Sequence, residues 1–157
     1  KMDRNEKLSD HFTFGELIRS ETAERKNIDN SPPDHLIVKL QRLCSEILEP
    51  VRLHYGKPFR PNSGYRSTEL NSEINGSSSS QHCKAEAVDI EIAGISNYEL
   101  AVWIEQNLEF DQVILECYRK GEPNSGWVHV SLKDEETTNR AIVLTYSNGS
   151  YSNGLLA

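Results

Sequence analysis

Apolar residues recur every three or four positions through residues 32–55, the longest patterned segment of the chain. This spacing predicts an amphipathic helix that has Pro33 near its first turn and a kink at Pro50. Capping-box patterns at Thr13 and Ser96, each followed three residues later by Glu, predict two shorter helices. The apolar stripe of the long helix consists of Leu36, Leu40, Leu43, Ile47, Leu48 and Val51.

The second half of the chain contains segments with the alternation typical of strands. Three of them follow one another without a predicted helix between them, which favours an antiparallel sheet with helices gathered on one side, an α+β fold. The tail, residues 146–157, is rich in Ser, Asn and Gly and reads as weakly ordered. The predicted strands cover residues 87–92, 111–117, 127–132 and 141–146.

Strand periodicity separates apolar from polar side chains in two of these segments. If the valine and isoleucine face of each strand packs on the helices, Asp89 and His129 project from the opposite face of one sheet. His82 lies on the loop that enters the first of these strands and can fold over the same face. The three residues form a candidate metal site, and a merely polar sheet face is the alternative.

Two imidazoles and one carboxylate suit zinc, whose catalytic sites use three protein ligands and leave a fourth position for water. Hydrolysis also needs a carboxylate that takes the proton of the water and passes it on. Glu116, at the end of the strand DQVILEC, is the first candidate for this base, and Asp111 and Glu91 are the reserves.

Length and composition indicate one soluble globular domain. The chain has 157 residues and a net charge of −7, with no basic run, which argues against a nucleic-acid-binding protein. No apolar run is long enough to span a membrane. Three widely spaced cysteines favour reduced thiols over a disulfide framework or a zinc finger. A monomer is favoured, although composition leaves the oligomeric state open.

The N-terminus lacks the apolar core of a signal peptide, which favours synthesis in the cytoplasm. Lys1 before Met2 reads as a remnant of recombinant expression, so a removed leader stays open. We expect residues 1–8 to be disordered or derived from expression, and residues 9–157 to form the single domain.

Five motifs, in order, resemble the zinc D-alanyl-D-alanine carboxypeptidase family. This family includes peptidoglycan D,D-peptidases, vancomycin-resistance dipeptidases and phage endolysins, and shares the hedgehog/DD-peptidase fold. The resemblance implies a zinc peptidase that acts on cell-wall stem peptides, with the sheet carrying zinc on the face opposite its helices. The motifs are FTFGEL (12–17), SGYRSTELN (63–71), SQHCKAEAVDI (80–90), FDQVILE (110–116) and WVHVS (127–131).

The resemblance also assigns roles to residues. It implies that the ligands of one zinc ion per chain are His82, Asp89 and His129. It implies that Arg66 binds substrate and stabilises the oxyanion, as suits a planar, always charged donor. The other assigned positions are Ser80 near the substrate and Glu116 as general base, with Tyr65 and Trp127 as substrate contacts or packing residues.

Two positions depart from the family pattern. Gly126 stands three residues before the last histidine, where some branches carry the catalytic acid, so the base assignment depends on Glu116. Ala85 stands where the family usually has glycine, and a positive φ there would cost about 1 kcal/mol and displace His82 slightly.

The functional hypotheses remain three. The first is a zinc peptidase of the D,D-carboxypeptidase or D,D-endopeptidase type, acting at the bacterial cell wall, with a phage lysis or tail-associated enzyme as a natural setting. An L-alanyl-D-glutamate endopeptidase is the alternative within the same chemistry. The second is a non-catalytic, zinc-stabilised module that binds the cell wall. The third is another zinc hydrolase such as a nuclease, which the acidic charge and the SGYR segment disfavour.

Overall fold

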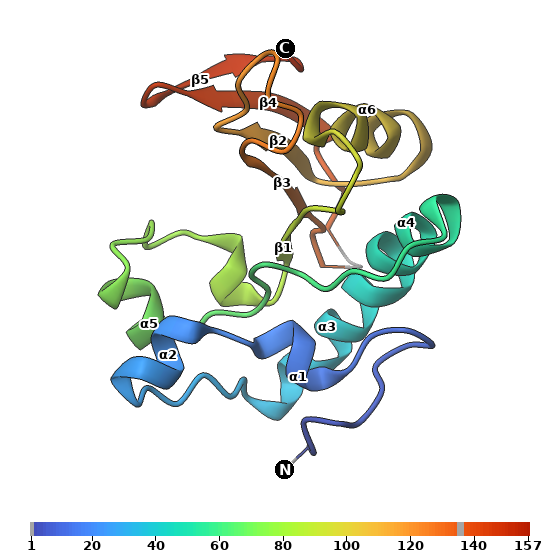
Figure 1. Ribbon diagram of the computed structural model, residues 1–157. Coiled ribbons are helices and arrows are strands. Elements are labelled where there is room, and N and C mark those ends of the chain that lie inside the picture. The colour runs from blue at the N-terminus through green and yellow to red at the C-terminus, as the bar shows by residue number, and fades with distance from the viewer. Residues whose placement is uncertain (1, 135–136) are drawn as a thin grey trace.

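The computed structural model describes residues 2–134 and 137–157 (Figure 1). Its helical elements are α1 (Phe14–Ile18), α2 (Glu21–Lys26), η1 (Asp34–Leu36), α3 (Ile37–Leu43), η2 (Cys44–Leu48), α4 (Glu49–Tyr55), α5 (Thr68–Glu73), η3 (Gln81–Lys84) and α6 (Asn97–Asn107). Its strands are β1 (Ala87–Ile90), β2 (Gln112–Glu116), β3 (Trp127–Ser131), β4 (Ile142–Ser147) and β5 (Ser150–Asn153). The α+β prediction is therefore confirmed.

The strands form one mixed sheet in the order β1-β3-β2-β4-β5. The prediction of an antiparallel sheet is correct for three pairings and wrong for the fourth, because β2 and β4 are parallel. After β3 the chain crosses past β2, and β4 then pairs with β2 on the side away from β3. Since this connection is short, β4 starts at the edge where β3 ends and so runs in the direction of β2.

The apolar face of the sheet packs against helices, as the alternation predicts. Side chains of β1, β2 and β3 share one core cluster with residues of η2 and α6. Figure 1 shows α6 beside the sheet, with α3 and α4 continuing the same covered side. The six strand residues on this face, each 0% exposed, are Val88, Ile90, Val113, Leu115, Val128 and Val130. Covering this face leaves the opposite one, with Asp89 and His129, available for chemistry.

The long helix predicted over residues 32–55 forms as one helical run from η1 to α4, but its irregularity precedes Pro50. A π-helical turn, η2, separates α3 from α4, and Pro50 lies in the first turn of α4. Proline has no N–H to donate to the preceding turn, and a wider turn accommodates that loss. No helix among the described residues has both the length and the apolar character needed to span a membrane.

Both ends of the chain take part in hydrogen-bonded structure. Residues 2–8, which belong to the segment expected to be disordered or derived from expression, lie against α1: the N–H of Phe14 donates to Glu6 O at 2.8 Å, and that of Gly15 to Arg4 O at 2.8 Å. The tail forms β5 instead of a weakly ordered terminus. Its turn has positive φ at Asn148 (51°) and Gly149 (80°), the combination that closes a tight hairpin.

Candidate metal centre and active site

The three predicted ligands come together on the open face of the sheet. His82, Asp89 and His129 each offer one donor atom, and these atoms lie within 4.8 Å of one another. Nε2 of His82 is 3.3 Å from Oδ2 of Asp89, and Nδ1 of His129 is 3.1 Å from Oδ1. Because β1 pairs with β3 so that Asp89 lies opposite His129, strand register alone brings two of the three ligands together.

The imidazole of His82 is held by the SGYR segment. Its Nδ1 lies 2.8 Å from the carbonyl oxygen of Gly64, to which it donates as N–H, so Nε2 is the atom that faces Asp89. The Ser80 hydroxyl caps the 3₁₀ turn by accepting from His82 N at 3.2 Å. Gly64 must be glycine, because a Cβ there would lie 2.2 Å from Leu17 O. The FTFGEL, SGYR and SQH motifs thus form one packed unit.

The backbone of Asp89 is fixed by the same segment. Its N–H donates to Ser63 O and its carbonyl accepts from Asn62 N, both at 2.8 Å. Burial by itself would raise the pKa of Asp89, but the imidazoles of His82 and His129 outweigh that effect and hold the pKa well below its usual range. The carboxylate is therefore ionised at neutral pH, as a metal ligand must be.

These donors fit zinc. Two imidazole nitrogens and one carboxylate oxygen form a set that zinc accepts, and three protein ligands are the number used by catalytic zinc sites. The hydrogen bond from His82 to Gly64 fixes the ring, as ligating histidines usually require. The prediction that one zinc ion binds here therefore agrees with the donor set and its geometry.

Glu116 lies on the same face, at the end of β2. It pairs across the strands with Trp127, whose indole N–H donates to Glu116 Oε2 at 3.2 Å. Burial and the charge of Asp89 raise the pKa of Glu116, against opposing effects from His129 and Trp127. A carboxylate with a raised pKa beside a metal site is well suited to proton transfer.

The reserve bases are engaged elsewhere. Asp111 is 0% exposed and is held by the guanidinium of Arg140, with Nη2 at 2.7 Å from Oδ2. Glu91 accepts from the side-chain amides of Asn62 and Asn97. Glu116 is therefore the best placed of the three candidate carboxylates.

Gly126 has a structural reason for departing from the family pattern. Its φ is +68°, and a Cβ there would lie 2.0 Å from Glu116 O. A side chain at this position requires the backbone of β2 to move. In this chain the backbone around Glu116 occupies the space that a catalytic acid at residue 126 would need.

Ala85 adopts the positive φ anticipated from the family glycine. Its φ is 57°, and its N–H donates back to the carbonyls of Gln81 and His82 at the end of η3. This left-handed conformation costs an alanine about 1–2 kcal/mol. The ligand trio is nevertheless assembled, and the Ala85 methyl is buried in the core.

The SQH motif contains a second polar residue whose role the sequence did not indicate. The amide of Gln81 donates to Glu86 Oε1 and to Asp111 Oδ2, both at 3.1 Å. These bonds connect the turn that carries His82 to the start of β2. Gln81 therefore positions the site without being a ligand.

A cavity of ≈ 610 Å³ surrounds the trio. Trp127, predicted to contact substrate, lines it, as does Tyr151, which no motif indicated. Tyr65 lies elsewhere: it is 7% exposed and lines a second cavity of ≈ 380 Å³. The predicted residues that line the metal cavity are Arg66, Ser80, His82, Asp89, Glu116, Trp127 and His129.

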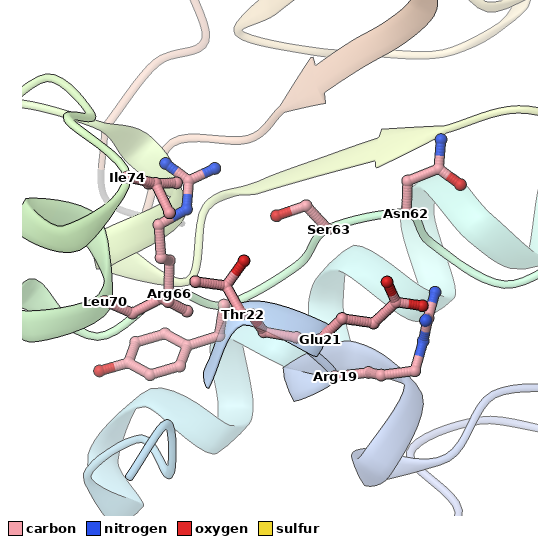
Figure 2. Close-up of a pocket in the computed structure, with 10 residues that line it drawn as sticks. Arg19, Glu21, Thr22, Asn62, Ser63, Arg66, Leu70 and Ile74 are labelled. Atoms are coloured by element: carbon pink, nitrogen blue, oxygen red, sulfur yellow. The ribbon is translucent and has the colours of Figure 1, made fainter. Parts of the chain in front are cut away.

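Arg66 lines both cavities. Its Nη1 donates to Asn71 Oδ1 at 2.9 Å, and its backbone N–H donates to His82 O at 3.1 Å. Figure 2 shows Arg66 at one end of the second cavity and Arg19 at the other, with Thr22 between them. The Arg66 guanidinium is thus tethered close to the metal ligands while keeping donors for a substrate.

Comparison with known proteins agrees with this geometry. The family model described as Peptidase M15 matches residues 10–131, which includes all five motifs and the three ligands. A search of curated proteins found no significant match. M15 peptidases are zinc-dependent and act on peptidoglycan. The chain belongs to the peptidase M15 family and is a zinc metallopeptidase.

Proposed function

We propose that this peptidase is of the D,D-carboxypeptidase or D,D-endopeptidase type and hydrolyses bonds in peptidoglycan stem peptides. The observation that carries the proposal is one cavity that contains the ligand trio, the Glu116 carboxylate and the Arg66 guanidinium. These are the groups needed for water activation and for binding an anion beside the attacked carbonyl.

The charge of the cavity supports an anionic substrate. Although the chain has a net charge of −7, basic side chains from three parts of the fold reach this cavity. Stem peptides carry free carboxylates, and guanidinium and ammonium groups pair with them. The basic residues are Arg66, Lys84 and Lys133, together with Arg140, whose guanidinium is already paired with Asp111.

Each group has a defined task in the mechanism. When bound by His82, Asp89 and His129, zinc lowers the pKa of a water molecule to about 7 and polarises the substrate carbonyl. Glu116 accepts the proton of the attacking water and returns it to the leaving amine. Arg66 donates hydrogen bonds to the oxygen on which negative charge develops.

The position of Arg66 also supports the assignment to the D,D-type. A fixed guanidinium beside the metal ligands binds a terminal carboxylate well, because the planar fork matches its two oxygens. The free α-carboxylate of D-Glu in the stem peptide offers the same chemistry, so an L-alanyl-D-glutamate endopeptidase is the second candidate.

The test is digestion of purified peptidoglycan, followed by mass spectrometry of the released fragments. We expect release of D-Ala, or opening of D,D cross-links, by the zinc-loaded wild type, and its loss on adding a chelator. Glu116→Gln should lower the rate by about 10²–10⁴-fold while zinc stays bound. Glu105→Gln, the same change at an exposed position of α6, is the matched control.

The outcomes separate the candidates. New N-terminal D-Glu identifies the L-alanyl-D-glutamate activity instead. If the wild type binds one zinc yet releases no fragment from any peptidoglycan type, the chain is a non-catalytic module. If it cleaves plasmid DNA at a rate that His129→Ala removes, the peptidase assignment is replaced by a nuclease.

A further inference from the structure

The β4–β5 hairpin lies outside the segment that matches the peptidase family. The match ends at residue 131, whereas the hairpin spans residues 142–153. β4 pairs along the whole of β2, from Gln112 to Glu116, so the hairpin extends the sheet beyond the strand that carries the proposed base. It therefore adds to the catalytic face a surface that the family motifs do not describe.

Two tyrosines of the hairpin continue the row of side chains that starts at Trp127. Tyr146 pairs with Glu116 across β2 and β4, and Tyr151 pairs with Tyr146 across the hairpin. Residues paired in this way project from the same face of a sheet. The two tyrosine rings lie 4.7 Å apart at an interplanar angle of 54°. The face thus reads Trp127, Glu116, Tyr146, Tyr151 from β3 outward.

Tyr151 is both exposed and part of the metal cavity. It is 58% exposed, yet it lines the same cavity as the ligand trio and Glu116. Burial raises the pKa of Tyr151, as do the nearby Glu116 and Tyr146, so its phenol stays protonated and can donate a hydrogen bond. An exposed aromatic ring held against a second ring gives a contact surface at low entropic cost.

Arg66 and Ser80 line the same cavity from the other part of the fold. They belong to the segments that lead into α5 and η3, whereas Tyr151 belongs to the sheet. In Figure 1 the α5 region and the β5 end of the sheet lie on the same side of the molecule, away from α4 and α6. A ligand that contacts both Arg66 and Tyr151 would therefore also pass His82, Asp89 and His129, which line the same cavity.

We infer that Tyr151, supported by Tyr146, forms a subsite for the residues of the stem peptide on the side of the scissile bond remote from Arg66. This inference rests on the proposed function. The ring would pack against a peptide group or an aliphatic side chain, and the phenol would donate to a substrate carbonyl. Tyr151 would thus decide how well extended substrates bind, while Arg66 would hold the opposite side.

A peptide fits this surface better than the glycan strand does. The cavity between Arg66 and Tyr151 also presents Lys84 and Lys133, whose charges suit the carboxylates of a stem peptide. The glycan offers mainly neutral hydroxyl and amide groups. Of the two acidic groups in the cavity, Asp89 would bind the metal and Glu116 would transfer the proton. The basic side chains are therefore left to pair with the carboxylates of the ligand.

The test measures binding separately from cleavage. Zinc-loaded protein carrying Glu116→Gln is titrated by calorimetry with the free stem pentapeptide L-Ala-γ-D-Glu-L-Lys-D-Ala-D-Ala and with the uncharged disaccharide GlcNAc-GlcNAc, which represents the glycan. Tyr151→Ala should weaken pentapeptide binding by about fivefold to tenfold. Tyr151→Phe, which keeps the ring, should weaken it by less than about threefold. Leu53→Ala is the control, because Leu53 is an 85% exposed apolar residue of α4, away from this cavity.

The inference fails if Tyr151→Ala binds the pentapeptide within twofold of the parent, or if Leu53→Ala weakens it equally. It also fails if the loss is confined to the disaccharide, which would place the glycan on Tyr151, or if the parent binds no pentapeptide. The proposed function is judged separately by fragment release from peptidoglycan. Binding that depends on Tyr151 without any release would sustain the subsite and overturn the peptidase proposal.

Discussion

The indole N–H of Trp127 donates a hydrogen bond to the carboxylate of Glu116 at 3.2 Å. The two residues face each other across β2 and β3, and His129 lies two positions further along β3. The sheet register therefore couples the proposed base to the metal ligand through one rigid strand. The sequence offered Trp127 as a substrate platform or a packing residue, and from this bond we expect it also to orient Glu116.

Replacing Trp127 by Phe should lower kcat by about 10-fold or more, because groups that orient catalytic side chains have effects of this size. Zinc content should stay at one per chain, since the ligand trio is untouched. Steady-state kinetics on a defined stem peptide and metal analysis give the two readouts. A rise in KM with unchanged kcat would instead identify Trp127 as a substrate platform.

Zinc should stabilise the protein through the trio alone. A ligand at 100 times its Kd adds about 2.7 kcal/mol to the free energy of unfolding, so thermal unfolding should shift upward on adding zinc. His82→Ala and His129→Ala should abolish this shift. His35→Ala, at an exposed position in η1, should leave it intact. A zinc-dependent shift that survives both ligand variants would place the metal elsewhere.

Loosening the anchor of Arg66 should weaken substrate binding without loss of zinc. Asn71 Oδ1 accepts from Arg66, and a Cβ at Gly76 would lie 2.1 Å from that oxygen. We expect Asn71→Ala and Gly76→Ala each to lower kcat/KM by about 10-fold, the effect of a charge-assisted hydrogen bond worth 1.4 kcal/mol. Ser78→Ala, in the same exposed loop, is the control. Unchanged kinetics in both variants would contradict the role of the anchor.

Substitutions at Ala85 should separate strain from packing. Ala85→Gly relieves a left-handed conformation worth about 1–2 kcal/mol, but it removes a buried methyl worth about 0.8 kcal/mol and adds chain flexibility. These effects nearly cancel, so stability should change by less than about 1 kcal/mol. Ala85→Val should cost about 2 kcal/mol or more, because a β-branched residue tolerates positive φ poorly. Urea unfolding of zinc-free protein measures both, and a Val variant as stable as wild type would refute the assigned conformation.

The pH dependence of stability should report the buried Asp111. Burial by itself would raise its pKa, but hydrogen bonds and charge from Arg140 outweigh this, and the net pKa is lowered. A carboxyl with a lowered folded-state pKa stabilises the protein fully above its unfolded pKa of about 3.9, and the contribution is lost as pH falls further. Asp111→Asn should cost about 1–3 kcal/mol at pH 7.

The difference between wild type and Asp111→Asn should shrink as the pH is lowered from 5 to 2, because the wild-type carboxyl then becomes protonated. Urea unfolding of both proteins across this range provides the measurement. A difference that stays constant through the acid range would mean that the ionised form of Asp111 contributes nothing to stability.

Local patterns in the sequence were sufficient to place the candidate ligands and most of the elements. Alternation in AVDIEI and WVHVSL correctly assigns Asp89 and His129 to the face opposite the buried valines, because strand side chains point to opposite faces in turn. The capping boxes at Thr13 and Ser96 correctly mark the starts of α1 and α6. These features depend on neighbours a few residues apart, which a sequence displays directly.

The tertiary structure decided what depends on distant segments. The parallel pairing of β2 with β4 follows from the path of the chain past β2, which alternation does not encode. The Asn148-Gly149 pair is typical of a hairpin turn. The residues of β5 are polar and exposed, however, so the sequence shows no apolar alternation that would predict a strand there. The clash that requires Gly126 and the bond from Trp127 to Glu116 arise between strands, so sequence spacing does not reveal them.

The sequence by itself therefore indicated the candidate ligand trio and the family of this protein, because both are written in short motifs. Only the fold decided which carboxylate lines the metal cavity beside the ligand trio, since Asp111 and Glu91 are held by partners remote in sequence. It also decided that Tyr151, from a tail without any motif, borders the metal cavity. Strand pairing brought it there, and pairing partners are chosen by the packing of the whole chain.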